Sequence, residues 1–269
     1  PGARDQVETK IVTAGDIEHV LAACTPPFSD GASRYALLLP QLERGIAYAC
    51  RYVTGERLQR YRFVHEPRSP LRVLGELTMR SDCINRLTWW LAYHTRAPRY
   101  VDPIFDHAFF MDGNVRTHRL GQRCGFTLGV VQQSFLLPVD RASEFLDAAR
   151  REFRSRSFWP SLADALFSPS SSAVLSASSG LPGLLITFGF ESSSRSRLHA
   201  VRSALRNLSA RCGEMGGRVQ LTKSVHASAE DLAGMYAHAL PRFGALKQRL
   251  DPQRVLRNEF LERVLPQLA

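Results

Sequence analysis

The order of strand-like and helix-like segments is the feature that most restricts the folds open to this chain. A β-type run at 9–13 precedes a helix that Asp16 can cap, and two strand patterns follow at 33–39 and 46–53. The theme returns as a strand at 127–137, a helix at 141–154, an apolar strand at 184–190, a helix at 193–211 and a strand at 218–221. This β-α-β-β-α-β order is typical of split βαβ folds. We therefore predict an α+β fold with an antiparallel β-sheet and helices on one face.

The remaining segments give weaker patterns. Residues 229–269 are helical in character, interrupted by Pro241 and Pro252, and predict a helical C-terminal tail. The stretch 61–103 is rich in arginine and aromatic residues but shows no clear period. A weak segment at 161–167 precedes a serine-rich stretch at 168–180, which is either a lid over a pocket or a solvated loop. The composition favours the solvated loop.

Charge narrows the classes of partner. The chain has 35 basic and 25 acidic residues, a net charge of +10 and a pI near 9.9. Only Lys10, Lys223 and Lys247 are lysines, so arginine dominates. The arginines are scattered and alternate with acidic residues on the helix predicted at 141–154, as on a solvated face. We therefore predict no nucleic-acid partner.

Cysteine usage and hydropathy bear on compartment and metal binding. Five cysteines at wide, irregular spacing, with no CxxC pair, argue against a disulfide framework and against a zinc site. The eight histidines form no metal-binding pattern, so we predict no metal site. No apolar run approaches the ~18–20 residues that span a bilayer, and no secretory signal is visible. These features predict a reducing, cytoplasmic location.

Local motifs do not identify a reaction. The sequence contains no GxGxxG, GxxxxGK[ST] or GxSxG pattern, and its carboxylates suggest no acid–base pair, so the catalytic residues stay unknown. Lys223, at the end of the last predicted strand, is unusual in an arginine-dominated chain, because a compact ammonium differs from a planar guanidinium. On these grounds alone, an exposed lysine at a strand end is the better interpretation.

Several motifs together resemble FAD-linked oxidases of the vanillyl-alcohol-oxidase fold group. The C-terminal motifs are moderately specific, and the resemblance extends over most of the chain, with a looser stretch between 61 and 103. The matching motifs are Gly216-Gly217-Arg218-Val219 with Lys223, Met235-Tyr236, Asp251-Pro252, Phe109-Phe110 with Arg119, Cys124-Gly125-Phe126, and Gln132 with Phe135 and Pro138.

The resemblance implies a domain organisation, a cofactor and site residues. Residues 1–223 would form a substrate-binding cap domain, and 224–269 a helical tail that packs on an FAD domain absent from this chain. FAD would be the cofactor, with Lys223 near the flavin ring, where a cation stabilises negative charge on the reduced flavin. Gln132, Phe110 and Arg119 match positions at the substrate pocket. The expected partners are an FAD-binding domain or chain and a small-molecule or lipid-linked sugar-like substrate.

The same pocket departs from the family pattern. A family lysine aligns with Ala165, a glutamine with Ser134, an asparagine with Leu185 and a cysteine with Thr187. Losing several polar contacts predicts a different, less polar substrate, or a pocket that has lost its original role. The chain is therefore either part of an oxidoreductase acting on an alcohol of a sugar-like substrate, or a flavin-free binding module, or a non-redox enzyme. Two further expectations are weak contact with anionic membranes and a homodimer covering the former flavin-facing side.

Overall fold

The computed structural model describes residues 6–54, 81–103, 129–253, 255 and 259–264. The strands are β1 (Gln6–Asp16), β2 (Ser33–Leu38), β3 (Arg44–Val53), β4 (Arg99–Pro103), β5 (Gly129–Leu137), β6 (Leu162–Ser168), β7 (Gly183–Ser192) and β8 (Arg218–Val219). The helices are α1 (Ile17–Ala23), α4 (Asp82–Thr95), α7 (Ala142–Ser155), α8 (Arg195–Glu214), α9 (Ala229–Met235), α10 (Leu240–Leu250) and α11 (Glu259–Val264), and a short 3-10 turn, η2 (Val139–Arg141), precedes α7.

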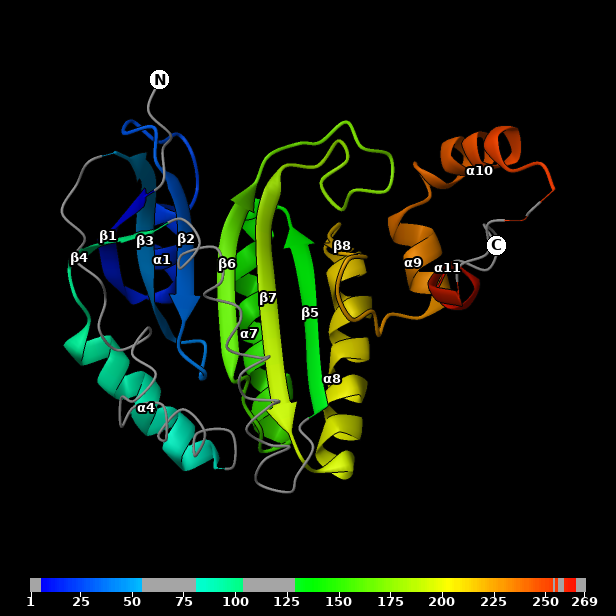
Figure 1. Cartoon of the computed structure of the whole chain (residues 1–269). Coiled ribbons are helices and arrows are strands. Elements are labelled where there is room, and N and C mark those ends of the chain that lie inside the picture. Colours follow the sequence, from blue (N-terminus) through cyan, green and yellow to red (C-terminus); the bar gives the residue numbers. More distant parts are fainter. Residues whose placement is uncertain (1–5, 55–80, 104–128, 254, 256–258, 265–269) are drawn as a thin grey trace.

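All eight described strands form one sheet in the order β4-β1-β3-β2-β6-β7-β5-β8 (Figure 1). Every pairing is antiparallel. The sheet consists of an N-terminal half, β4-β1-β3-β2, and a C-terminal half, β6-β7-β5-β8. The two halves join through β2 and β6, where Tyr35 pairs with Leu166 and Leu37 with Asp164. The predicted antiparallel α+β fold is confirmed, and β6 occupies the weakly patterned segment at 161–167.

Three of the predicted helices cover one face of this sheet. Helix α1 packs on β1 and β3, α8 packs on β5 and β7, and α7 contacts both α1 and α8. The apolar positions of α7 point inward, so that Phe145 and Phe153 meet Phe135 of β5 and Phe188 of β7 with ring centroids 5.0–6.4 Å apart. These fully buried rings lie at the centre of the main core. We call the sheet face that α1, α7 and α8 cover the helix face.

A further helix, α4, lies on the opposite face, in the stretch that the sequence left unassigned. Its side chain Tyr93 is buried against Ile46 and Tyr48 of β3. The indole Nε1 of Trp89 donates to the Ser161 carbonyl oxygen at 3.1 Å, which ties α4 to the start of β6. We call the sheet face that carries α4 the second face. Helix α4 contacts it at β3, in the N-terminal half.

The C-terminal tail begins at a well-formed cap. The Ser228 hydroxyl accepts from the Asp231 N–H at 3.0 Å, and the Asp231 carboxylate accepts from Ser228 in return. The buried Tyr236 hydroxyl donates to the Val219 carbonyl at 2.6 Å, which holds α9 against β8. The predicted helical tail is thus present as α9, α10 and α11, beyond the β8 edge in Figure 1. A domain boundary at 223/224 stays a prediction.

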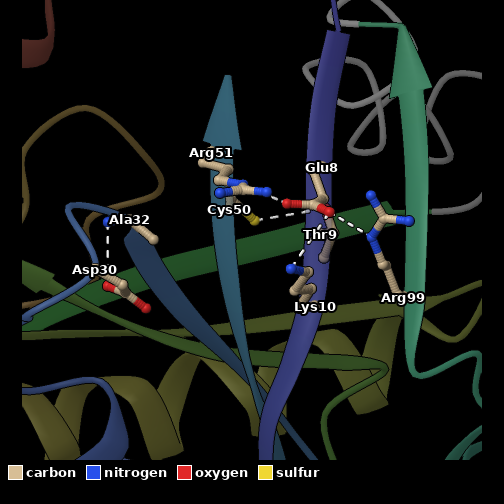
Figure 2. Close-up of polar contacts among 8 residues, drawn as sticks. All are labelled: Glu8, Thr9, Lys10, Asp30, Ala32, Cys50, Arg51 and Arg99. Carbon is tan, nitrogen blue, oxygen red and sulfur yellow. Dashed lines mark hydrogen bonds and ion pairs between the residues drawn. The ribbon is translucent and has the colours of Figure 1, made fainter. Parts of the chain in front are cut away.

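A charged cluster ties the outer strands of the N-terminal half together. Glu8 of β1 is 1% exposed and accepts hydrogen bonds from Arg51 of β3 and Arg99 of β4, with Lys10 at 3.5 Å (Figure 2). Burial is the largest single influence on the Glu8 carboxyl and raises its pKa, but the arginines together bring that pKa below its usual value. This cluster therefore stabilises the charged form of a buried acid and acts as a structural clamp.

Candidate functional site

A polar row crosses the second face of the C-terminal half. Residues directly opposite each other in antiparallel strands share a face, so Asp164 of β6, Thr187 of β7 and Ser134 of β5 form one row. Their neighbours Ala163, Ala165 and Phe135 point into the core on the helix face. Gln220, just after β8, extends the row by donating its N–H to the Ser134 carbonyl at 2.9 Å. The row therefore runs over four adjacent strand positions.

The hydroxyl groups of the row lie close together. Thr187 Oγ1 lies 2.9 Å from Ser134 Oγ, and either hydroxyl can be the donor. Both hydroxyl side chains are buried. Asp164, at the β6 end of the row, is half-buried.

An apolar row runs beside the polar one. Leu166, Leu185 and Leu136 lie opposite one another on β6, β7 and β5, two residues along each strand from the polar row. On the other side of the polar row, Gly189 of β7 lies between Leu162 of β6 and Gln132 of β5. Glycine presents no side chain there. The polar row therefore lies between a row of leucines, of which Leu166 is exposed and Leu136 fully buried, and Gly189.

The segment that carries Lys223 is bonded to β5 at two points. Along the strand edge, the Ser224 N–H donates to the Gln132 carbonyl at 2.9 Å. On the helix face, the fully buried Gln133 accepts from the His226 N–H at 2.9 Å and donates to the Ser209 hydroxyl of α8 at 2.7 Å. Lys223 directly precedes Ser224 and lies three residues before His226, so its position depends on a core amide as well as on its neighbours.

Lys223 and Asp164 are both shifted toward their uncharged forms. Burial raises the pKa of the Asp164 carboxyl, and the Thr187 hydrogen bond and the charge of Lys223 only partly oppose it. Burial likewise lowers the pKa of the Lys223 ammonium against the attraction of Asp164. Lys223 and Asp164 attract each other, but for each group this attraction is smaller than the cost of removing its charge from water. Their arrangement contrasts with the Glu8 clamp and is the kind found at functional sites.

The structure places four of the predicted site residues together. Gln132, Ser134, Thr187 and Leu185 all lie on the second face of adjacent strands, next to Lys223 or to the polar row. Phe110 and Arg119 lie outside the described residues. Their pocket roles stay predictions.

Ala165, which aligns with a family lysine, lies away from the second face. It is fully buried on the helix face and cannot contribute to a site on the second face. The strand period of two explains the difference, since the adjacent residue, Asp164, takes the opposite face.

The serine-rich loop between β6 and β7 is packed rather than solvated. Arg218 donates to the carbonyl oxygens of Ala177 at 3.0 Å and Ser179 at 2.6 Å. Val174 and Leu175 contact the main core. The expectation of a loop without a packed role is therefore wrong, because Arg218 and the core side chains fold it onto the sheet end.

Three residues of the site were missed by sequence reasoning. Asp164 is the only charged residue in the strand sequence LADALFS, and its alternation with core alanines was the signal that could have found it. Gln133 and Gln220 gave no such signal, because their partners come from segments distant in sequence.

The family comparison concerns the C-terminal half of the chain. The profile of the D-arabinono-1,4-lactone oxidase family matches residues 137–264, which include β6, β7, α8 and Lys223. A search of curated protein sequences found no significant match.

Solved structures share the fold over nearly the whole chain. Cholesterol oxidase from B. sterolicum matches with a TM-score of 0.58 at 11% identity, over 97% of this chain and 60% of that one. A solvent-stable cholesterol oxidase matches with a TM-score of 0.53 at 11% identity, over 96% and 59%. The chain thus spans about three fifths of the length of these structures. It shares the fold of these cholesterol oxidase structures over that part of their length.

The oxidase-family match implies FAD as the cofactor, as expected from the sequence. The residues on the second face fit one part of it. A flavin ring has flat apolar faces and a polar edge. The second face offers exposed Leu166 on β6 and, next to β5, a cation, Lys223, that forms no ion pair among the described residues. In the described ranges, no group of three or more His, Cys, Asp or Glu could hold a metal ion. No helix there is long and apolar enough to cross a membrane.

Proposed function

We propose that this chain is the substrate-binding part of an FAD-dependent oxidoreductase that oxidises an alcohol of a sugar-like substrate, with the flavin held mainly by a separate domain or chain. The observation that carries the proposal is the juxtaposition of Lys223 with the polar row on the second face, within the segment matched by the oxidase family. The motif resemblance to decaprenylphosphoryl-ribose 2′-oxidase supports a sugar-like substrate.

Each residue has a proposed task. When bound, FAD supplies the hydride acceptor for alcohol oxidation. Lys223 holds a positive charge beside the ring edge, where burial strengthens its electrostatic effect. Gln132, Ser134, Thr187 and Leu185 form the substrate side of the site, and Gln133 keeps the Lys223 turn in place from the core. Phe110 and Arg119 are proposed to complete the pocket.

The test is the visible absorption spectrum of the full purified protein, before and after addition of FAD and desalting. We expect a retained flavin band, and a lower flavin midpoint potential in Lys223→Met, because the variant loses the charge that favours the reduced cofactor. Lys10→Met is the matched control, since Lys10 lies beside Glu8 on the other half of the sheet. An unchanged potential in Lys223→Met contradicts the role of Lys223.

The same spectrum separates the rival functions. A chain that retains no flavin, alone or with a co-purified partner, would be a binding module or a non-redox enzyme built on the cap fold. Anaerobic bleaching of the flavin band by D-arabinono-1,4-lactone or by related sugars would identify the substrate. Contact with membranes and dimerisation are separate proposals, tested by flotation with anionic vesicles and by analytical ultracentrifugation.

A further inference from the structure

Helix α4 has an exposed apolar side in addition to the side that packs on the sheet. On the inner side, the Trp89 indole donates to the Ser161 carbonyl oxygen, and Tyr93 is buried against β3. On the outer side, Leu87 is 51% exposed and Trp90 is 54% exposed. Two adjacent tryptophans therefore have different surroundings, since Trp89 ties the helix to the sheet whereas Trp90 faces solvent. The helix lies at the periphery of the described fold in Figure 1.

The exposed residues of the outer side form a stripe at helical spacing. Cys83, Leu87, Trp90 and His94 follow one another at steps of four, three and four residues, which places them on one side of a helix. The ring centroids of Trp90 and His94 lie 4.5 Å apart. Exposed large apolar residues that are grouped in this way indicate a contact surface, whereas single ones are common on any protein.

The charges beside the stripe are positive. Arg86 is exposed on the same helix, and its guanidinium carbon lies 5.5 Å from the centre of the Trp159 ring. Near the other end of the helix, the guanidinium carbons of Arg44 and Arg96 lie 5.0 Å and 4.4 Å from the centre of the Tyr93 ring. None of the exposed side chains described on α4 is acidic. Arginines therefore flank the apolar stripe near both ends of the helix.

These features distinguish between possible partners. In a symmetric dimer the stripe of one chain would meet that of the other, with arginine against arginine and no exposed acid described on α4 to compensate. Two large exposed apolar side chains are also far fewer than the roughly 20–30 residues that each chain contributes to a stable protein interface. An anionic bilayer accepts both components, because its headgroup phosphates attract arginine while tryptophan and leucine enter the interfacial layer.

We propose that the outer side of α4, with Leu87 and Trp90 at its centre and Arg86 beside them, docks on the surface of an anionic lipid bilayer. The helix would lie in the plane of the membrane, since its 14 residues at about 1.5 Å each are too few to span one. The net charge of the chain suggests such contact only in general, and the structure adds the surface that makes it. This inference does not rest on the proposed oxidoreductase function.

The test is flotation of the full purified protein with vesicles of phosphatidylcholine alone, or of phosphatidylcholine and phosphatidylglycerol in equal parts. At low salt, we expect the wild type to bind the mixed vesicles at least roughly tenfold more strongly, because each arginine near an anionic surface adds about fivefold. Trp90→Gln should weaken binding to the mixed vesicles roughly tenfold, and Leu87→Gln roughly threefold. Leu250→Gln changes an exposed leucine of α10 and is the matched control, which should bind like the wild type.

Tryptophan fluorescence is a second readout, which a loss of folding would not reproduce. The emission should shift to shorter wavelength on the mixed vesicles as Trp90 leaves water. Trp90→Phe should abolish this shift, because only Trp89 and Trp159 then remain. Thermal unfolding of the variants should match that of the wild type, since each substitution is at an exposed position.

Several results would overturn the proposal. They are no flotation of the wild type, wild-type binding by Trp90→Gln, and an equal loss in Leu250→Gln, which would assign the contact to α10. A wild-type dimer that Trp90→Gln dissociates in analytical ultracentrifugation would assign the stripe to a second copy of the chain and would also overturn the proposal. None of these results changes the flavin spectrum, so the oxidoreductase function is tested separately.

Discussion

Replacing Gln133 by methionine tests how the core positions Lys223. Methionine has nearly the shape of glutamine but can neither accept from the His226 N–H nor donate to Ser209. Removing the acceptor from a largely buried N–H costs about 1–3 kcal/mol, and loss of the Ser209 bond costs about 1 kcal/mol. The Ser209 hydroxyl keeps its bond to the Leu205 carbonyl at 2.7 Å, which limits the second loss. We therefore expect a destabilisation of about 2–4 kcal/mol in total.

Equilibrium unfolding in urea measures this loss, and amide hydrogen exchange locates it. The His226 amide should exchange faster in Gln133→Met than in the wild type, since its acceptor is gone. Ser209→Ala should cost about 1 kcal/mol. Adding it to Gln133→Met should cost less than the sum of the two single variants, because they share one hydrogen bond. A Gln133→Met protein that is as stable as the wild type, with an unchanged His226 amide, would refute this account of the Lys223 turn.

Three further predictions concern the sheet. Phe188→Ala should lower the free energy of unfolding by about 3–5 kcal/mol in urea titrations, since Phe188 contacts three core rings. Glu8→Gln should destabilise the protein most above pH 4.5, the usual Glu pKa, and the difference in free energy of unfolding from the wild type should vanish as pH falls through the lowered pKa of Glu8 in the folded state. Unfolding of both proteins in urea at neutral and at acid pH checks the direction of this change. Gly217→Ala should cost about 1–3 kcal/mol by thermal unfolding, because its Cβ would lie 2.6 Å from the Leu136 carbonyl, whereas Gly234→Ala in α9 has open space and should be neutral or stabilising.

Local patterning was sufficient to predict the elements with strong periodicity. The inward positions of α7 and the apolar strand β7 follow from spacing alone, and the Asp16 cap of α1 is formed as expected, with the Asp16 carboxylate accepting from the His19 N–H at 3.1 Å. Helix α4 was not predictable in the same way. Its apolar residues do not form one clean stripe, since Tyr93 is buried while Trp90 and Leu87 are exposed. Its position comes from packing against β3, a contact distant in sequence.

In the candidate site, too, some features could be predicted from the sequence and others depend on contacts between distant segments. The sequence predicted the fold class from the local order of its elements, and its resemblance to FAD-linked oxidases implied the cofactor and the candidate residues Lys223, Gln132, Ser134, Thr187 and Leu185, whose roles stay predictions. Only the tertiary structure decided that Asp164 and not Ala165 faces the site, and that Gln133 holds the Lys223 turn from the core. The physical reason is that sheet register and cross-strand hydrogen bonds join residues tens of positions apart, and one step along a strand exchanges the two faces.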